Sequence, residues 1–347
     1  MDSDLSGPQK FHVRPTPRVG GVPVLAGLLA ALIMGWLRIG EDVALFVALL
    51  LAGLPVFLAG LVEDLTKRVR PLYRLIFAFA SAGLAAWWGG AILSSLGVPR
   101  VDTVLAAVPA LAVLLTIFAV GGVCHATNII DGYNGLMGGV AIAILAALAY
   151  VSFAVGDMPL LVIAVSMVGA LFGFLLWNFP KGLIFAGDAG AYLVGFLLAE
   201  ISVLLVGRHP GVVSPWFPML LMIYPVFETL FSIYRRKKRQ AAAGLPDSMH
   251  FHQMVYKRLV RWMVGSREAK YLVRRNSLTA PYLWGVALFS IMPAVLFWRV
   301  QWLLQLCCVL FILLYLWLYR RIVQFRSPRW LVLHRREDVS SGESVKP

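Results

Sequence analysis

Charged residues are scarce in this sequence. Only 14% of its 347 residues are Asp, Glu, Lys or Arg, whereas 60% are hydrophobic and the mean hydropathy is +0.80. A soluble domain of this length does not need so much apolar surface to form its core. The composition therefore argues against an ordinary soluble globular protein and predicts a chain that crosses a membrane several times.

Cysteine is rarer still. The three cysteines, Cys124, Cys307 and Cys308, lie within or at the ends of apolar segments. They show neither metal-binding spacing nor a disulfide framework, so we interpret them as packing residues. The sequence also lacks a cleavable signal peptide, because its first twenty residues are polar and basic.

Long apolar segments fill most of the chain. A membrane-spanning helix needs about 20 mostly apolar residues, and the sequence predicts ten such spans in an all-α fold. The predicted spans are Val22–Leu37, Val43–Val62, Leu72–Leu93, Val104–Val123, Met137–Val155, Leu160–Trp177, Ala189–Val206, Trp216–Tyr234, Leu278–Trp298 and Trp302–Tyr319.

The distribution of basic residues predicts the orientation. All but four of the 31 Lys and Arg residues lie in the N-terminal segment, the loops after even-numbered spans and the C-terminal tail; the exceptions are Arg38, Arg100, Arg208 and Arg299. The positive-inside rule then places both termini in the cytoplasm. The net charge of +14 thus reflects topology and contact with anionic lipids, and no nucleic-acid partner is expected. We divide the chain into a cytoplasmic segment (1–21), a membrane catalytic domain (22–320) that includes a cytoplasmic loop (235–277), and a basic cytoplasmic tail (321–347).

Polar motifs gather on this same predicted cytoplasmic side. They comprise the N-terminal segment with Arg14 and Arg18, the pair Glu63-Asp64, the stretch 128–136, the stretch 178–191, and the loop with His250 and His252. If these residues only capped helices, they would be distributed over both faces of the membrane. The segregation therefore predicts one cytoplasmic active site built from several helix ends.

The residue types in these motifs indicate phosphoryl chemistry. Carboxylates at a membrane surface suit Mg²⁺, which takes one or two of them together with phosphate oxygens. The candidates are Glu63, Asp64, Asp131 and Asp188. Arginine and histidine side chains suit phosphate or pyrophosphate, and the candidates are Arg14, Arg18, His250, His252 and the run 235–239. The combination predicts transfer between a soluble phosphorylated donor and a lipid acceptor.

Simpler interpretations stay open for single residues. Asp188, at the start of an apolar segment, could be an N-cap that needs no ligand. The pair Glu63-Asp64 could belong to a solvated charged turn. Two further residues lie at or inside spans. His125 could line the site, although packing or a helix-end hydrogen bond is the preferred interpretation, and Glu200 is held as an unexplained paired acid.

Taken together, the motifs resemble those of the polyprenyl-phosphate N-acetylhexosamine-1-phosphate transferases. Five motifs occur in family order between about His12 and Gln253, and Pro15-Thr16-Pro17-Arg18 before Gly20-Gly21 is more similar to the O-antigen and capsule-type branch. Members transfer a sugar-1-phosphate from a UDP-sugar, typically of the N-acetylhexosamine type, to undecaprenyl phosphate. They release UMP and use Mg²⁺, with Mn²⁺ as a substitute. The resemblance implies a multi-pass enzyme of the bacterial plasma (inner) membrane, homodimerisation, and the first membrane step of cell-envelope polysaccharide synthesis.

The resemblance also implies roles for particular residues. Asp188 matches the metal-binding aspartate of the family's Gly-Asp-x-Gly motif. Glu63 and Asp64 match paired acids that handle or deprotonate the lipid phosphate, and this makes them catalytic candidates together with Asp131. Asn128 and Asp131 match an Asn-x-x-Asp-Gly motif near the nucleotide.

The remaining matches include departures from the family. Asn178 matches an asparagine near the nucleotide, and His250 and His252 match two of the three histidines in a His-x-His-His motif near the donor pyrophosphate. Gln253 replaces the third histidine, and Asn134 replaces an acid, so any role of Asn134 must be hydrogen bonding. At two positions a glutamate stands where the family usually has an aspartate: Glu63 and Glu228.

Two other functions remain open at this point. One is a secondary transporter of an anionic solute that uses the same residues as a cytoplasmic gate. It would need broken or charged helices near the midplane and inverted repeats, and neither is evident in the sequence. The other is an inactive homologue that binds lipid phosphate, which the departures at Asn134 and Gln253 favour.

Overall fold

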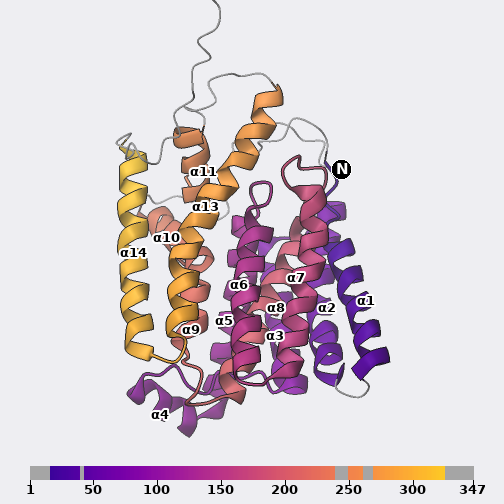
Figure 1. Ribbon diagram of the computed structural model, residues 1–347, viewed down its shortest axis with the longest axis vertical. Helices are drawn as coiled ribbons and strands as arrows, with labels where there is room; N and C mark the ends of the chain where they lie inside the picture. Colours follow the sequence, from indigo (N-terminus) through magenta and orange to yellow (C-terminus); the bar gives the residue numbers. More distant parts are fainter. Residues whose placement is uncertain (1–15, 40–42, 239–248, 261–268, 325–347) are drawn as a thin grey trace, which may run out of the picture.

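The computed structural model describes residues 16–39, 43–238, 249–260 and 269–324, and these residues form a bundle of mostly upright helices (Figure 1). In chain order the helices are α1 (Gly21–Ile39), α2 (Ala44–Thr66), α3 (Pro71–Gly89), α4 (Pro99–Ala107), α5 (Pro109–Ile130), α6 (Leu136–Ala154), α7 (Met158–Asn178), α8 (Gly187–Arg208), α9 (Trp216–Leu221), α10 (Ile223–Lys238), α11 (Phe251–Met254), the π-helix η2 (Val255–Val260), α13 (Ala269–Phe297) and α14 (Gln301–Val323). The short helix α4 lies across the lower end of the bundle.

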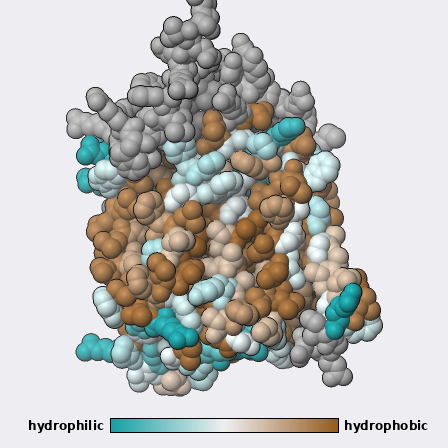
Figure 2. All heavy atoms as spheres, in the orientation of Figure 1, coloured by the Kyte–Doolittle hydropathy of each residue, from teal (hydrophilic) through white to brown (hydrophobic). Residues whose placement is uncertain are grey.

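Eight of the described helices are long and apolar enough to cross a membrane: α1, α2, α5, α6, α7, α8, α13 and α14. Figure 2 shows the matching surface, with hydrophobic residues across the middle of the visible face and hydrophilic residues mainly toward its two ends. The prediction of an all-helical multi-pass membrane protein is confirmed. The count of ten spans and the orientation of the termini stay predictions.

Two predicted spans have the wrong boundaries, and proline accounts for both. The span expected at Val104–Val123 is interrupted at Val108, because a residue that precedes proline is disfavoured in the α conformation, and α5 starts at Pro109. The span expected at Trp216–Tyr234 divides at Met222 into α9 and α10. Pro225 lacks the N–H that would bond the carbonyl of Leu221, the last residue of α9.

Helix α8 forms the centre of the bundle. Its whole apolar window is buried inside the protein, and it packs most extensively against α2 and α5. Glycines permit the close approach: a Cβ on Gly60 of α2 would lie 2.5 Å from the backbone nitrogen of Ala189, and one on Gly195 would lie 2.7 Å from Cα of Cys124. This packing brings the start of α8 to the ends of α2 and α5.

Glu200, in the middle of α8, differs from its expectation as a paired acid. Its side chain is 0% exposed, and neither carboxyl oxygen has a hydrogen-bond partner among the described residues. A buried polar group without a partner costs about 1–3 kcal/mol. We therefore expect Glu200→Met to raise the thermal unfolding temperature in detergent and to preserve activity, while Glu200→Gln, which keeps a polar group, gains little. A lower unfolding temperature for Glu200→Met would show that the carboxyl group is stabilising.

Candidate active site

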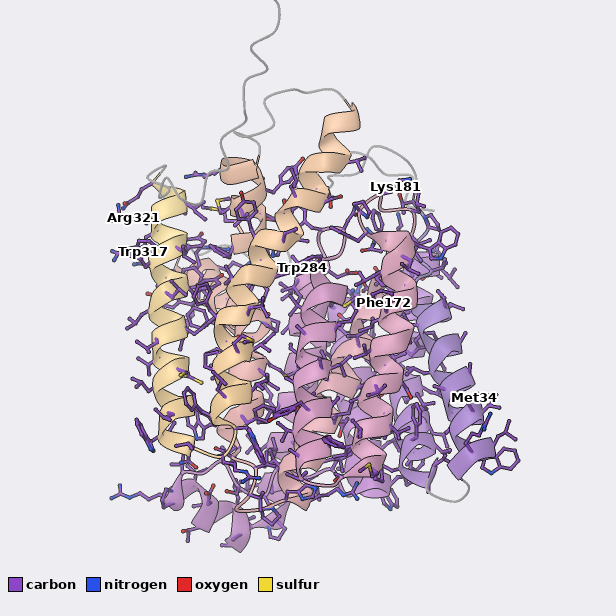
Figure 3. The ribbon with its side chains drawn as sticks, in the orientation of Figure 1. Met34, Phe172, Lys181, Trp284, Trp317 and Arg321 are labelled. Carbon is purple, nitrogen blue, oxygen red and sulfur yellow. The ribbon has the colours of Figure 1, made fainter. Side chains whose placement is uncertain are left out.

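The predicted site residues meet at the upper end of the bundle, around a cavity of about 620 Å³. The ends of α2 and α5 and the start of α8 lie here. Figure 3 marks this end by Lys181, in the loop between α7 and α8, with Trp284 of α13 farther down. Seven of the predicted residues line the cavity: Arg18, Asn128, Asp131, Asn178, Asp188, His250 and His252.

Asp188 lies in the first turn of α8, but its side chain does not cap that helix. Its Oδ2 forms an ion pair with Arg74 of α3, and its Oδ1 accepts a hydrogen bond from Nδ2 of Asn128 at 3.2 Å. The interpretation of Asp188 as an N-cap is therefore wrong. Its carboxylate points toward groups from two other helices and into the cavity.

Asp64, at the end of α2, provides the cap that Asp188 does not. Its two carboxylate oxygens accept hydrogen bonds from the backbone N–H groups of Asp188 and Ala189, each at 2.9 Å. These N–H groups are free of intrahelical partners at any helix start, and the helix dipole favours a negative charge there. Asp64 thus fixes the position of Asp188 relative to α2.

Gly187 makes this contact possible. Its φ is +71°, and a Cβ at this position would lie 2.5 Å from Oδ2 of Asp64. We expect Gly187→Ala to displace Asp64 and to reduce activity about 100-fold, because small shifts of catalytic groups have effects of that size. Gly173→Ala on α7, where a Cβ meets nothing within 4 Å, is the matched control and should leave activity unchanged. Equal activities of the two variants would contradict this account of the Asp64 contact.

Glu63 lies apart from the cavity, although it is adjacent to Asp64 in sequence. Its Oε2 accepts a hydrogen bond from the backbone N–H of Val69 at 2.7 Å, and this bond closes the loop after α2. Neighbouring helical residues point about 100° apart, so the two acids face different surroundings. The geometry favours Asp64 over Glu63 as the acid that acts beside Asp188.

Asp131 follows the last residue of α5 and lines the cavity. Burial raises the pKa of this carboxyl well above its usual range, the negative charges of Asp188 and Asp64 raise it further, and Arg18 opposes the change. An acid in such surroundings favours a bound proton or a bound cation. This end of the cavity is therefore suited to a positively charged ligand.

Two asparagines hold the loops of the cavity together. Asn178 accepts a hydrogen bond from the Gly135 N–H at 2.6 Å and donates one to the Ile184 carbonyl at 2.8 Å, so it positions the loops on both sides. Asn134 donates from Nδ2 to the Pro180 carbonyl at 3.1 Å. An ionised aspartate could not donate this bond, which gives a physical reason for asparagine here.

The two histidines stack beside the cavity. Their rings lie 5.1 Å apart and nearly parallel, and His250 Nδ1 is 3.2 Å from Oε1 of Glu228. The buried carboxylate of Glu228 also accepts hydrogen bonds from the Phe251 N–H and the Tyr315 hydroxyl, both at 2.8 Å. Glu228 therefore holds the start of α11 and orients His250 toward the cavity.

The basic residues near α10 divide into two groups. Arg236 lines the cavity together with Arg18. Arg235, which we had grouped with the phosphate-binding run, is turned away: it donates to the Met249 carbonyl at 2.7 Å and to the Tyr319 hydroxyl at 2.9 Å. Arg14 and Arg239 lie outside the described residues.

The N-terminal motif contributes backbone to the site. The Gly20 and Gly21 N–H groups donate to the carbonyls of Phe185 and Ala186 at 2.9 Å, and the Phe185 N–H donates to the Pro17 carbonyl at 3.0 Å. This pairing holds the segment with Arg18 against the loop that leads into α8.

Sequence reasoning missed one contributor to the site. Arg74 was counted among the topological charges, although a charged residue at the start of an apolar helix is itself a functional signal. For His125 both interpretations hold: its Nδ1 lies 3.3 Å from the Tyr192 hydroxyl, and the residue lines the cavity.

The described residues contain no group of three or more His, Cys, Asp or Glu side chains arranged to hold a metal ion. Mg²⁺ does not require one, because it commonly takes one or two carboxylates and completes its shell with water and substrate phosphates. Asp188, with Asn128 on one oxygen and the electrostatic influence of Asp131 and Asp64 nearby, fits that kind of site.

Known proteins share sequence similarity with much of this chain. The sequence model described as glycosyl transferase family 4 matches residues 46–206. The chain is 26% identical over 309 residues to the probable undecaprenyl-phosphate N-acetylglucosaminyl 1-phosphate transferase of Bacillus subtilis (strain 168). The matched region covers 86% of this chain and 78% of that protein. It is 27% identical over 261 residues to the undecaprenyl-phosphate alpha-N-acetylglucosaminyl 1-phosphate transferase of Thermotoga maritima, with coverages of 75% and 74%.

A third relative is the decaprenyl-phosphate N-acetylglucosaminephosphotransferase of Mycobacterium leprae (strain TN), 29% identical over 316 residues, with coverages of 82% and 75%. The segment matched by the family includes α5 and α8, which carry Asn128 and Asp188, and it includes Asp64 and Asp131. The O-antigen branch stays a prediction. Residues 46–206, a little under half of this chain, are thus similar to glycosyl transferase family 4.

Proposed function

We propose that this protein transfers a sugar-1-phosphate of the N-acetylhexosamine type from a UDP-sugar to undecaprenyl phosphate and releases UMP. The reaction takes place at the cytoplasmic face of the bacterial inner membrane, as the first membrane step of cell-envelope polysaccharide synthesis. One observation carries the proposal: Asp131 and Asp188 line a single cavity together with the basic groups of Arg18, Arg236 and the histidines, and Asp64 holds the start of α8 beside it. The names of the relatives support the same chemistry.

The proposed reaction is a displacement at phosphorus. An oxygen of the lipid phosphate attacks the phosphorus that bears the sugar, and the bond from this phosphorus to the bridging oxygen breaks, so that UMP leaves with the electron pair. Mg²⁺, bound at Asp188 with Asn128 and Asp131 nearby, would supply charge neutralisation for the phosphate oxygens.

The protein's own side chains position the reactants. Asp64 fixes the start of α8 and keeps the lipid phosphate deprotonated or oriented; a double displacement through this acid is the alternative route. His250, His252 and Arg236 face the cavity and offset negative charge on the donor. Asn178 acts indirectly, since its amide is already engaged by the loops that surround the donor.

The proposal is tested by incubating the purified full-length protein with undecaprenyl phosphate, Mg²⁺ and each member of a panel of UDP-sugars. We expect one or a few UDP-N-acetylhexosamines to give equal amounts of UMP and lipid-linked sugar phosphate. Release of UMP without lipid product would indicate hydrolysis instead of transfer.

The same assay separates the other two functions. A transporter of an anionic solute would accumulate its substrate in proteoliposomes and release no UMP. An inactive homologue would bind lipid phosphate or nucleotide without turnover. Either result would overturn the proposed transfer.

A further inference from the structure

Arg74 connects α3 to the candidate metal residue. It lies in the first turn of α3, only 15% of its side chain is exposed, and it forms an ion pair with Oδ2 of Asp188. Its Nε is also buried and has no hydrogen-bond partner among the described residues. A buried N–H without an acceptor is unfavourable, so its presence points to an acceptor that the described residues do not supply.

Both oxygens of Asp188 are in contact with nitrogen donors. Arg74 approaches Oδ2, and Asn128 donates to Oδ1. A divalent ion can share the carboxylate with an amide by binding the amide oxygen after a side-chain flip, whereas the charge of a guanidinium stays beside the ion. Two cations on one oxygen repel each other, so the ion and Arg74 weaken each other's binding at Oδ2.

From this competition we propose that Arg74 is a positioning residue that neutralises Asp188 and moves to a phosphate group of the substrate when a divalent ion binds Asp188. The inference rests on the proposed function, because it assumes that Asp188 binds the ion. A guanidinium suits this movement from carboxylate to phosphate, because it stays charged and presents several N–H groups in a planar fork that matches phosphate. The Nε atom gains its missing acceptor in the same movement.

The neighbours of Arg74 favour a short movement. The hydroxyl of Tyr192 and the carboxylates of Glu63 and Asp188 all contribute electrostatically to this guanidinium. Arg74 also acts electrostatically on His125, which lines the cavity and lies 3.3 Å from the Tyr192 hydroxyl. A phosphate oxygen that entered the cavity at His125 would therefore come close to the guanidinium.

The exchange couples two ligands. A phosphate that holds Arg74 away from Asp188 strengthens binding of the divalent ion, and by thermodynamic reciprocity the ion strengthens binding of the phosphate to the same degree. Substitution of Arg74 by an uncharged residue should therefore do two things. It should tighten ion binding in the absence of substrate, and it should abolish the dependence of ion binding on phosphate.

The test measures Mn²⁺ binding by electron paramagnetic resonance, with full-length protein in nanodiscs. We compare wild type with Arg74→Met and with the matched control Arg70→Met, which removes an exposed arginine from the position just before α3. Each is titrated in discs with undecaprenol, in discs with undecaprenyl phosphate, and in undecaprenol discs with UMP present. We expect Arg74→Met to bind Mn²⁺ about tenfold more tightly than wild type, as expected when one competing charge contact is lost, and Arg70→Met to match wild type.

The phosphate arms identify the source of the group. A gain in Mn²⁺ affinity with undecaprenyl phosphate that wild type shows and Arg74→Met lacks assigns Arg74 to the lipid. The same difference with UMP, after correction for Mn²⁺–UMP in buffer, assigns it to the nucleotide side. The absence of a gain in both arms overturns the inference, and this comparison needs no variant. Equal affinities for Arg74→Met and Arg70→Met also overturn it. If Asp188→Asn binds Mn²⁺ as wild type does, the proposed metal site itself is wrong, which is a distinct failure.

Discussion

Asp188→Asn is expected to abolish sugar-phosphate transfer. The substitution keeps the size of the side chain and its contact with Asn128, but it removes the negative charge that would hold a divalent ion. Such an ion supplies several kcal/mol of transition-state stabilisation, so we expect a loss of about 10³-fold or more. The turnover of lipid-linked product at saturating Mg²⁺ measures the effect.

The fold should survive this change. The backbone N–H groups of residues 188 and 189 remain bound to Asp64, and only the ion pair with Arg74 is lost. Gel filtration and thermal unfolding in detergent provide the check, with Asp102→Asn as the matched control at the opposite end of the bundle. A nearly normal rate of transfer by Asp188→Asn would mean that the metal is bound elsewhere.

Asp64→Asn and Asp64→Ala are expected to separate two roles of one residue. Asparagine keeps one oxygen that can accept one of the two helix-start hydrogen bonds, whereas alanine loses both, and each loss costs about 1 kcal/mol. Asp64→Asn should therefore unfold somewhat below the wild-type temperature, and Asp64→Ala should unfold at a still lower one. Both should lose about 10²-fold or more in turnover if the charge of Asp64 handles the lipid phosphate.

The outcome decides between a structural and a chemical role. If Asp64→Asn keeps wild-type turnover while Asp64→Ala loses it, Asp64 only caps α8 and the acid that acts on the lipid must be another residue. Glu63→Gln is the companion variant, since Glu63 lies apart from the cavity and bonds the loop at Val69. We expect its effect on turnover to be smaller than that of Asp64→Asn.

The sequence predicted the helical class and most helices because apolar length is a strong signal in a membrane protein. It failed at α4, α9 and α10, where proline ends a helix inside a continuous apolar segment. Hydropathy averaged over a span does not register such a break. The position of a single proline has to be considered as well.

The residues of the site were also largely predictable as a set, since they stand out as polar groups at the ends of apolar segments. Their partners were not. The cap on α8 comes from Asp64, 124 residues earlier in the chain, and the counter-ion of Asp188 comes from Arg74. Such pairings depend on how glycines such as Gly60 and Gly187 let helices approach, which a single sequence does not specify.

The enclosure of α8 has a consequence for the membrane around this protein. Its apolar window is wholly buried, so lipid tails press on the outer helices and not on the element that carries Asp188. A change in bilayer thickness acts first on outer helices such as α1 and α14, and it reaches α8 only through the helices packed around it, which include α1, α2 and α5. The thickness of the hydrocarbon layer is therefore felt at Asp188 only indirectly, as a shift of those helices.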